Sequence, residues 1–206
     1  NNERFNWKIM WGAASAVLLW TLWYGWYTNG GDISYGRLNK IPFQEIKWYH
    51  AMAPGILLIL TRIGVPVSTS FLVLSAFAST FVLEKMLMKS MMGYAVAAVA
   101  AYAIWIVVSK ILDEAKPVKE EHKSYWRVGQ WVTTGFLWFT WLSHDMANIA
   151  VFLPREIPYD LMIMISVVFI AGLAYMFREG GGKIQKIVLE KHNTRYVRSA
   201  TIIDCV

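Results

Sequence analysis

The sequence predicts an all-α integral membrane protein, built as a multi-span helical bundle with broken helices or re-entrant hairpins. Three observations support this fold class. Hydrophobic residues make up 56% of the 206 positions and charged residues only 17%, against about 25% in soluble domains. Long apolar stretches alternate with short polar connections. The net charge of +6 comes from Lys and Arg residues that flank these stretches, as is typical of membrane spans.

The same observations exclude several classes of protein. Because the basic residues lie between apolar stretches, they form no soluble positive face, and we expect no nucleic-acid partner. The single cysteine, Cys205, excludes an internal disulfide framework and a multi-cysteine metal site. We therefore expect a multi-pass protein of the cell (plasma) membrane, in direct contact with the lipid bilayer.

The first apolar block, residues 9–27, is predicted to be a transmembrane helix. It holds 19 residues without a charge. At about 1.5 Å per residue it spans roughly 28 Å, close to the thickness of the hydrocarbon core of a bilayer. Trp and Tyr residues gather toward its end, as in the aromatic belt at a membrane interface.

The second apolar block, residues 51–83, is too long for one upright span. Its 33 residues would form a helix of roughly 50 Å. Gly64 and Pro66 predict a helix break inside it, because proline removes a backbone donor and disturbs the helix. The pattern permits a crossing or a re-entrant hairpin, and the sidedness of the Lys and Arg residues in the connections favours the crossing. A third apolar block, residues 91–111, follows.

A charged segment, residues 113–127, is the clearest boundary in the chain. It separates one membrane portion, residues 1–112, from a second one, residues 128–206. The second portion begins with two further apolar blocks, residues 128–153 and 159–177, and the latter is predicted to be a membrane span.

The C-terminal tail has two parts. Residues 183–198 are basic and predict an amphipathic helix at the membrane interface. Residues 199–206 are apolar again and predict the beginning of another span. We therefore expect the chain to be an internal fragment of a longer protein.

The first polar cluster lies at the break in the second block. Ser68, Thr69 and Ser70 supply three consecutive hydroxyls close to Pro66, where a disturbed helix leaves backbone groups without partners. Non-helical backbone at membrane depth is tolerated where it is buried in protein or lines a cavity. A helix that restarts here would also direct its N-terminal amides toward an anion. The alternative is a kinked helix whose hydroxyls bond back to its own carbonyls.

The second polar cluster lies inside the fourth apolar block. Asp145 would cost about 2.5–3.5 kcal/mol to insert into a bilayer, so it is a functional candidate by default. Asn148 lies three residues further along and shares a helix face with Asp145, so the two side chains can coordinate a cation or bind a polar solute together. The alternative is that Asp145 reaches water or pairs with a basic residue such as Arg155.

Ser143, His144 and Asp145 hold the residue types of a hydrolase triad. Consecutive helical residues point about 100° apart, however, and cannot form the relay that this chemistry needs. The other histidines show no metal-ligand spacing. We therefore expect no enzymatic activity, no organic cofactor and no catalytic or structural metal centre.

Taken together, the two polar clusters resemble the inorganic phosphate transporter family, often called PiT, the sodium- or proton-coupled phosphate permeases. That family carries a G-x-P-V-S-T-T-H element and a G-A-N-D-V-A-N-A element, each once per inverted repeat. The first is similar to Gly64-Val65-Pro66-Val67-Ser68-Thr69-Ser70-Phe71, and the core of the second to Asp145-Met146-Ala147-Asn148. Phe71 departs from the family's His, and His144 from the Asn that precedes the Asp.

The resemblance implies part of an inverted-repeat transporter, with residues 1–112 as the end of the first repeat and residues 128–206 as the start of the second. It implies a secondary active symporter that moves inorganic phosphate together with Na⁺ or H⁺, and a homo-oligomer remains an open expectation. The implied roles are substrate binding by Ser68, Thr69, Ser70 and Asn148, binding of the coupling Na⁺ or proton by Asp145 and Asn148, and a helix break at Gly64 and Pro66.

Three other functions stay open on the sequence alone. The substrate can be another oxyanion such as sulfate. The protein can be a non-transporting membrane subunit with a structural or assembly role. A membrane-embedded enzyme is the third, and it is disfavoured because one acidic residue, Asp145, is all that the interiors of the apolar blocks contain.

Overall fold

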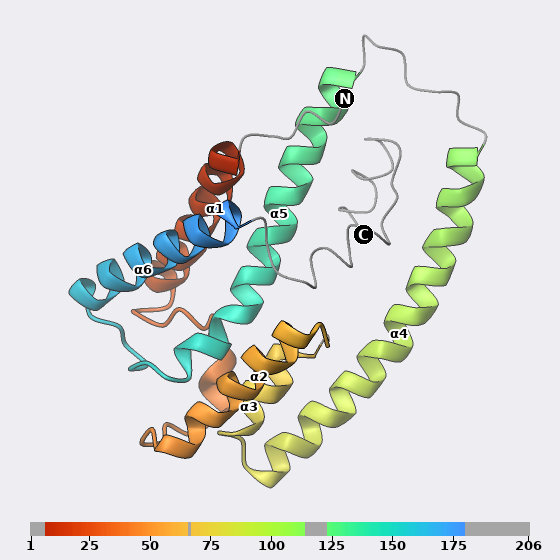
Figure 1. Cartoon of the computed structure of the whole chain (residues 1–206). Helices are drawn as coiled ribbons and strands as arrows, with labels where there is room; N and C mark the ends of the chain where they lie inside the picture. The colour runs from red at the N-terminus through yellow and green to blue at the C-terminus, as the bar shows by residue number, and fades with distance from the viewer. Residues whose placement is uncertain (1–6, 66, 114–122, 180–206) are drawn as a thin grey trace. The chain divides into compact units, whose positions relative to one another are not determined.

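The structure is a computed structural model that describes residues 7–65, 67–113 and 123–179 (Figure 1). Every regular element in this part of the chain is a helix, so the expected all-α class is confirmed there. The elements in chain order are α1 (Trp7–Thr28), η1 (Arg37–Lys40), η2 (Trp48–Ala51), α2 (Met52–Ile63), α3 (Thr69–Ser75), α4 (Thr80–Asp113), α5 (Lys123–Ala150) and α6 (Tyr159–Arg178), where η marks a short 3₁₀ helix.

Two helices in the described part are long and apolar enough to cross a membrane. They are the segment Thr80–Ile106 of α4 and the whole of α6. The helix α1 matches the predicted block at residues 9–27 closely but does not reach the same mean hydropathy. Its Trp and Tyr side chains lower its mean hydropathy, because they count as weakly polar although they suit a membrane interface.

The chain divides into two compact units, which are described separately here. The first lies within Asn1–Phe77 and Gly135–Asn193, and contains α1, α2, α3, most of α5, and α6. The second lies within Ala78–Thr134 and Thr194–Val206, and contains α4 and the first turns of α5.

In the first unit, α1 packs against α6. The indole of Trp11 donates a hydrogen bond to the carbonyl of Ile170 (3.0 Å), and the indole of Trp26 donates to the carbonyl of Ile157 (2.7 Å). Trp11, near the start of α1, bonds to a later residue of α6 than Trp26, near the end of α1, whose partner lies just before α6. The two helices are therefore antiparallel. Leu22 of α1 and Met162 of α6 are fully buried and form part of the core of this unit.

The predicted break in the second block is confirmed. The helix α2 ends at Ile63, and Gly64 follows with a φ of 89°, a left-handed conformation that glycine adopts without strain. The helix α3 begins at Thr69 and packs against α2. With 12 and 7 residues, neither helix reaches the roughly 30 Å of a bilayer core, so their lengths favour the hairpin over a crossing. Pro66, the other expected break residue, lies outside the described residues.

A second break, which the sequence does not announce with a proline or glycine, separates α3 from α4. The break lies at Phe77, whose side chain is 2% exposed and stacks on the ring of His50. The side-chain amide of Gln44 also donates to the Phe77 carbonyl (3.0 Å). The expected division between the blocks at residues 51–83 and 91–111 is therefore wrong, because α4 runs without interruption through the charged residues between them.

The helix α5 begins earlier than predicted, at Lys123 rather than after the charged segment. The last residues of segment 113–127 are thus helical, and residues 114–122 lie outside the described residues. The helix α6 agrees with the predicted block at residues 159–177, with Asp160 in its first turn and Arg178 in its last, where each charge favours the helix dipole. The expectations for residues 183–206 also lie outside the described part.

Candidate functional site

A compact turn after α1, within the first unit, positions the basic side chain of Arg37. The carboxylate of Asp32 accepts hydrogen bonds from the Ser34 amide (2.7 Å), the Ser34 hydroxyl (2.8 Å) and the Gly36 amide (3.1 Å). Ser34 is fully buried, and Leu38 on the following 3₁₀ helix is 2% exposed. Because both flanks are fixed in this way, Arg37 begins η1 from a well-defined position.

The guanidinium of Arg37 reaches the imidazole of His144 on α5. Its Nη2 lies 2.6 Å from His144 Nε2. Arginine only donates hydrogen bonds, so Nε2 is the acceptor and a neutral His144 carries its proton on Nδ1. That Nδ1 lies 3.3 Å from Oδ1 of Asp145, to which it donates. A single imidazole ring therefore separates the Arg37 guanidinium from the Asp145 carboxylate.

The same carboxylate contacts the hydroxyl cluster at the helix break. The Ser70 hydroxyl donates to Asp145 Oδ1 over 3.5 Å, which joins two sites 75 residues apart in the chain. The structure thus brings together one residue from each polar cluster of the sequence. We call the set Arg37, His144, Asp145 and Ser70 the polar chain.

Ser68 has a different role from Ser70, and Thr69 is the first residue of α3. The Ser68 side chain caps α3 by accepting a hydrogen bond from the Phe71 amide (3.3 Å). The alternative for the cluster was that its hydroxyls donate to carbonyls of their own helix. Thr61 and Ser75, which flank the cluster, do this, whereas Ser68 and Ser70 make the other bonds described above. Because α3 has only seven residues and its Phe71 amide is already bonded, the expected anion site at backbone amides is not supported.

Asn148 lies one turn after Asp145 but in a different environment. The Asp145 side chain is 52% exposed, whereas Asn148 is 6% exposed. Neither the oxygen nor the nitrogen of the Asn148 amide has a hydrogen-bond partner in the described part of the chain. A buried amide without partners costs about 1–3 kcal/mol, so this position favours a bound group that supplies them.

The charges of the polar chain balance one another. Partial burial lowers the pKa of the Arg37 guanidinium, while the Asp145 carboxylate raises the same pKa. Since the usual value lies far above neutrality, Arg37 keeps its charge. The polar chain sets one guanidinium against one carboxylate, and these opposite charges cancel. An anion that enters alone would therefore leave the site negatively charged.

These contacts bear on two earlier interpretations. The 52% exposure of the Asp145 side chain agrees with the alternative that it reaches water, whereas Arg155 does not pair with it, because Arg155 Nη2 donates to the carbonyl of Ile41 (2.8 Å). The neighbours His144 and Asp145 contact each other, although consecutive helical residues point about 100° apart. A hydrolase triad still does not form, since the Ser143 hydroxyl donates to the Thr140 carbonyl (2.9 Å) and the Ser70 hydroxyl contacts the carboxylate rather than the imidazole.

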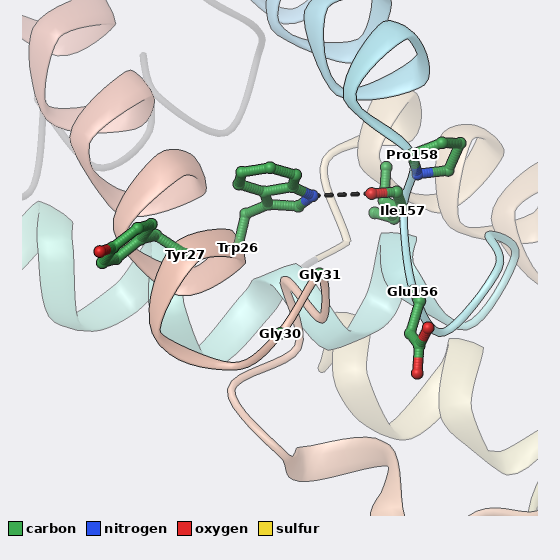
Figure 2. A pocket seen from close by; sticks show the side chains of 7 residues that line it. All are labelled: Trp26, Tyr27, Gly30, Gly31, Glu156, Ile157 and Pro158. Atoms are coloured by element: carbon green, nitrogen blue, oxygen red, sulfur yellow. Dashed lines mark hydrogen bonds between the residues drawn. The ribbon is translucent and has the colours of Figure 1, made fainter.

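A separate hollow of about 560 Å³ lies where α1 ends and α6 begins. Figure 2 shows Trp26 beside the segment 156–158, with its indole bonded to the Ile157 carbonyl, and the carboxylate of Glu156 directed away from that indole. The charged group in its lining is this acidic side chain, which repels anions. The hollow is therefore distinct from the polar chain and does not suit an oxyanion.

Sequence reasoning missed Arg37 and treated His144 as a departure from a motif. Arg37 lies in a polar connection, where a basic residue is ordinarily solvated, so its own neighbourhood gave no signal. The informative signal was the compact Asp32 turn just before it, since Asp followed by Ser and Gly favours a tight turn. Among the described residues, no group of three His, Cys, Asp or Glu side chains lies close enough to hold a metal ion.

Comparisons of the chain with known protein families, with curated proteins and with solved structures find no match. The resemblance to phosphate transporters therefore depends on the two short motifs alone. The geometry around Asp145 and Ser70 is the independent observation from which a function can be argued.

Proposed function

We propose that the protein is a symporter that carries inorganic phosphate across the cell membrane together with Na⁺ or H⁺. The observation that supports this most is the contact between Ser70 and Asp145, 3.5 Å apart and 75 residues apart in sequence. Each comes from one of the two motifs that resemble the phosphate transporter family. A shared site is what such a transporter would build from them.

The charge balance of the polar chain supports coupling to a cation. Ser70 offers a hydroxyl donor, and Asp145 is an ionised acceptor beside it. A phosphate anion next to this carboxylate is repelled unless a cation or a proton enters with it. Asn148, buried and unpartnered, offers an amide oxygen to such a cation or an amide N–H to the anion.

The helix lengths support the membrane part of the proposal. The two apolar helices α4 and α6 would cross the bilayer, and α1 would cross with its aromatic end at the interface. The hairpin formed by α2 and α3 would enter the membrane without crossing it. Its irregular backbone is then tolerated because it lines the site.

Asp145 favours phosphate over sulfate as the substrate. Phosphate at neutral pH keeps at least one proton that can be donated to a carboxylate, whereas sulfate has none. A carboxylate accepts hydrogen bonds but cannot donate them. Sulfate would therefore leave Asp145 facing an anion without a hydrogen bond, a pairing that specific sites use to reject the wrong ligand.

Uptake of labelled phosphate by the full-length protein in proteoliposomes tests the proposal. We expect uptake that depends on a Na⁺ or H⁺ gradient and is not inhibited by equimolar sulfate. Transport of sulfate instead of phosphate would favour the other oxyanion. Absence of any gradient-driven oxyanion uptake would contradict transport and leave the structural or assembly subunit as the better interpretation.

The variant Asp145→Asn separates a site residue from a structural one. We expect uptake to fall by about 10- to 100-fold, equivalent to about 1.5–3 kcal/mol for a lost hydrogen bond to a charged group. The matched control is Glu156→Gln, which removes an exposed acid from the same unit and should transport normally. Lost expression of Asp145→Asn, rather than lost uptake at normal expression, would indicate a structural role.

A further inference from the structure

We propose that Arg37 binds the anion in this site, as the cation that holds a free tetrahedral oxyanion against Ser70. This inference rests on the proposed function and adds to it a binding residue that lies outside both motifs. The starting observation is the 2.6 Å contact between Arg37 Nη2 and His144 Nε2, which places the guanidinium one imidazole away from Asp145.

Arg37 is well suited to this role because its backbone is fixed while its side chain reaches the surface. Asp32 holds the preceding turn with three hydrogen bonds, and buried Leu38 anchors the following one. The guanidinium has five N–H donors in a planar fork, and one of them contacts His144. The remaining donors suit the bidentate geometry with which arginine holds phosphate and sulfate.

The present partner of Arg37 is one that an anion can replace. A neutral imidazole nitrogen is a weaker acceptor for a guanidinium than an oxyanion, because the oxyanion adds the attraction between opposite charges and accepts two of the N–H donors at once. His144 therefore holds Arg37 close to Asp145 when no anion is bound. A bound oxyanion replaces His144 as the acceptor of the guanidinium. The positive charge of Arg37 then offsets the repulsion between the anion and the Asp145 carboxylate.

Binding of inorganic phosphate to the purified full-length protein tests this role. The protein is placed in nanodiscs of phosphatidylcholine, and phosphate binding is measured by calorimetry and by the rise in Tm that a ligand of the folded state causes. For Arg37→Gln we expect the dissociation constant to rise about 10- to 100-fold, as for the loss of a hydrogen bond to a charged group. Arg37→Lys should lie between it and the wild type, since lysine keeps the charge but loses the fork.

The matched control is Lys40→Gln, which removes an exposed positive charge from the same 3₁₀ helix. We expect it to bind phosphate like the wild type. Equal weakening by Lys40→Gln and Arg37→Gln would overturn the proposal, since binding would then follow net charge. The Tm without phosphate shows whether each variant is folded, and Arg37→Lys replaces Arg37→Gln if the latter is not.

The outcomes distinguish this inference from the proposed function. Phosphate binding that is unchanged in Arg37→Gln overturns the role of Arg37 and leaves phosphate transport standing. Binding of sulfate but not phosphate, lost in Arg37→Gln, supports the role of Arg37 and contradicts phosphate as the substrate. A Tm that responds to added phosphatidylglycerol but to neither free anion would identify a lipid headgroup as the ligand and overturn the proposal.

Discussion

Two polar regions of the first unit use their polar groups in different ways: the turn after α1 (residues 29–36), and the helix break after α2 together with the first turn of α3, called the break below. In the turn, Asp32 bonds to the backbone and side chain of its own neighbours. In the break, Ser70 bonds to a carboxylate on another helix. The bonds of Asp32 fix the shape of the turn itself, whereas the Ser70 hydroxyl reaches another helix, where a solute can share the contact.

The largest effect on stability should come from the turn. Asp32→Ala removes the acceptor of three hydrogen bonds and leaves the buried Ser34 hydroxyl without its partner. We expect the free energy of unfolding to fall by about 3 kcal/mol, the upper range for hydrogen bonds to a charged group. Thermal unfolding in detergent measures this. Glu45→Ala, an exposed acid in the same connection, is the control, and an equal loss there would show that net charge rather than the turn is responsible.

A smaller loss should follow from crowding the contact that holds the turn on α1. The ring of Tyr35 covers Gly25, and its hydroxyl donates to the Thr21 carbonyl (2.6 Å). An added Cβ at Gly25 would lie 2.7 Å from Tyr35 Cε2, so Gly25→Ala should cost about 1–3 kcal/mol. Gly12→Ala meets open space on the same helix and should gain up to about 1 kcal/mol. Equal Tm values for the two variants would contradict the packing described here.

The smallest effect on folding, and a clear one on transport, should come from the break. Ser70→Ala removes the hydroxyl that contacts Asp145, and we expect phosphate uptake to fall about 5- to 10-fold, equivalent to about 1–1.4 kcal/mol. Its Tm should stay within experimental error. Ser75→Ala is the matched control, because that hydroxyl bonds to Leu72 of its own helix (3.0 Å). A Tm loss in Ser70→Ala without an uptake defect would make the break a structural region like the turn.

The comparison also explains what the sequence could predict. The helix break was predictable because Gly64 and Pro66 interrupt an apolar stretch, where any departure from a helix needs a physical reason. The boundaries of α6 were predictable because a charged residue lies at each end of an uncharged run. The end of α3 was not, since it depends on Phe77 packing on His50, a contact 27 residues away that leaves no local signal.

The candidate site was predictable in its parts but not in its assembly. Asp145 and the hydroxyls at Ser68, Thr69 and Ser70 were visible as polar groups in apolar surroundings. Their meeting through Ser70 alone depends on how α3 and α5 pack, which composition does not encode. Arg37 could not be selected from the sequence, because a basic residue in a connection is ordinarily solvated and its partner, His144, is known only from the structure.

The two indole hydrogen bonds along α1 have a mechanical consequence. Trp11 and Trp26 are fifteen residues apart, or about 22 Å along the helix; Trp26 bonds to the carbonyl of Ile157 just before α6, and Trp11 to the carbonyl of Ile170 within α6. Sliding α1 along α6 by one helical turn would break both bonds at once, so the two bonds together fix the register of the pair. The amide of Ile157 also donates to the Gly31 carbonyl (3.0 Å). The base of the Asp32 turn is therefore tied to the start of α6, so the position from which Arg37 reaches His144 depends on the α1–α6 pair.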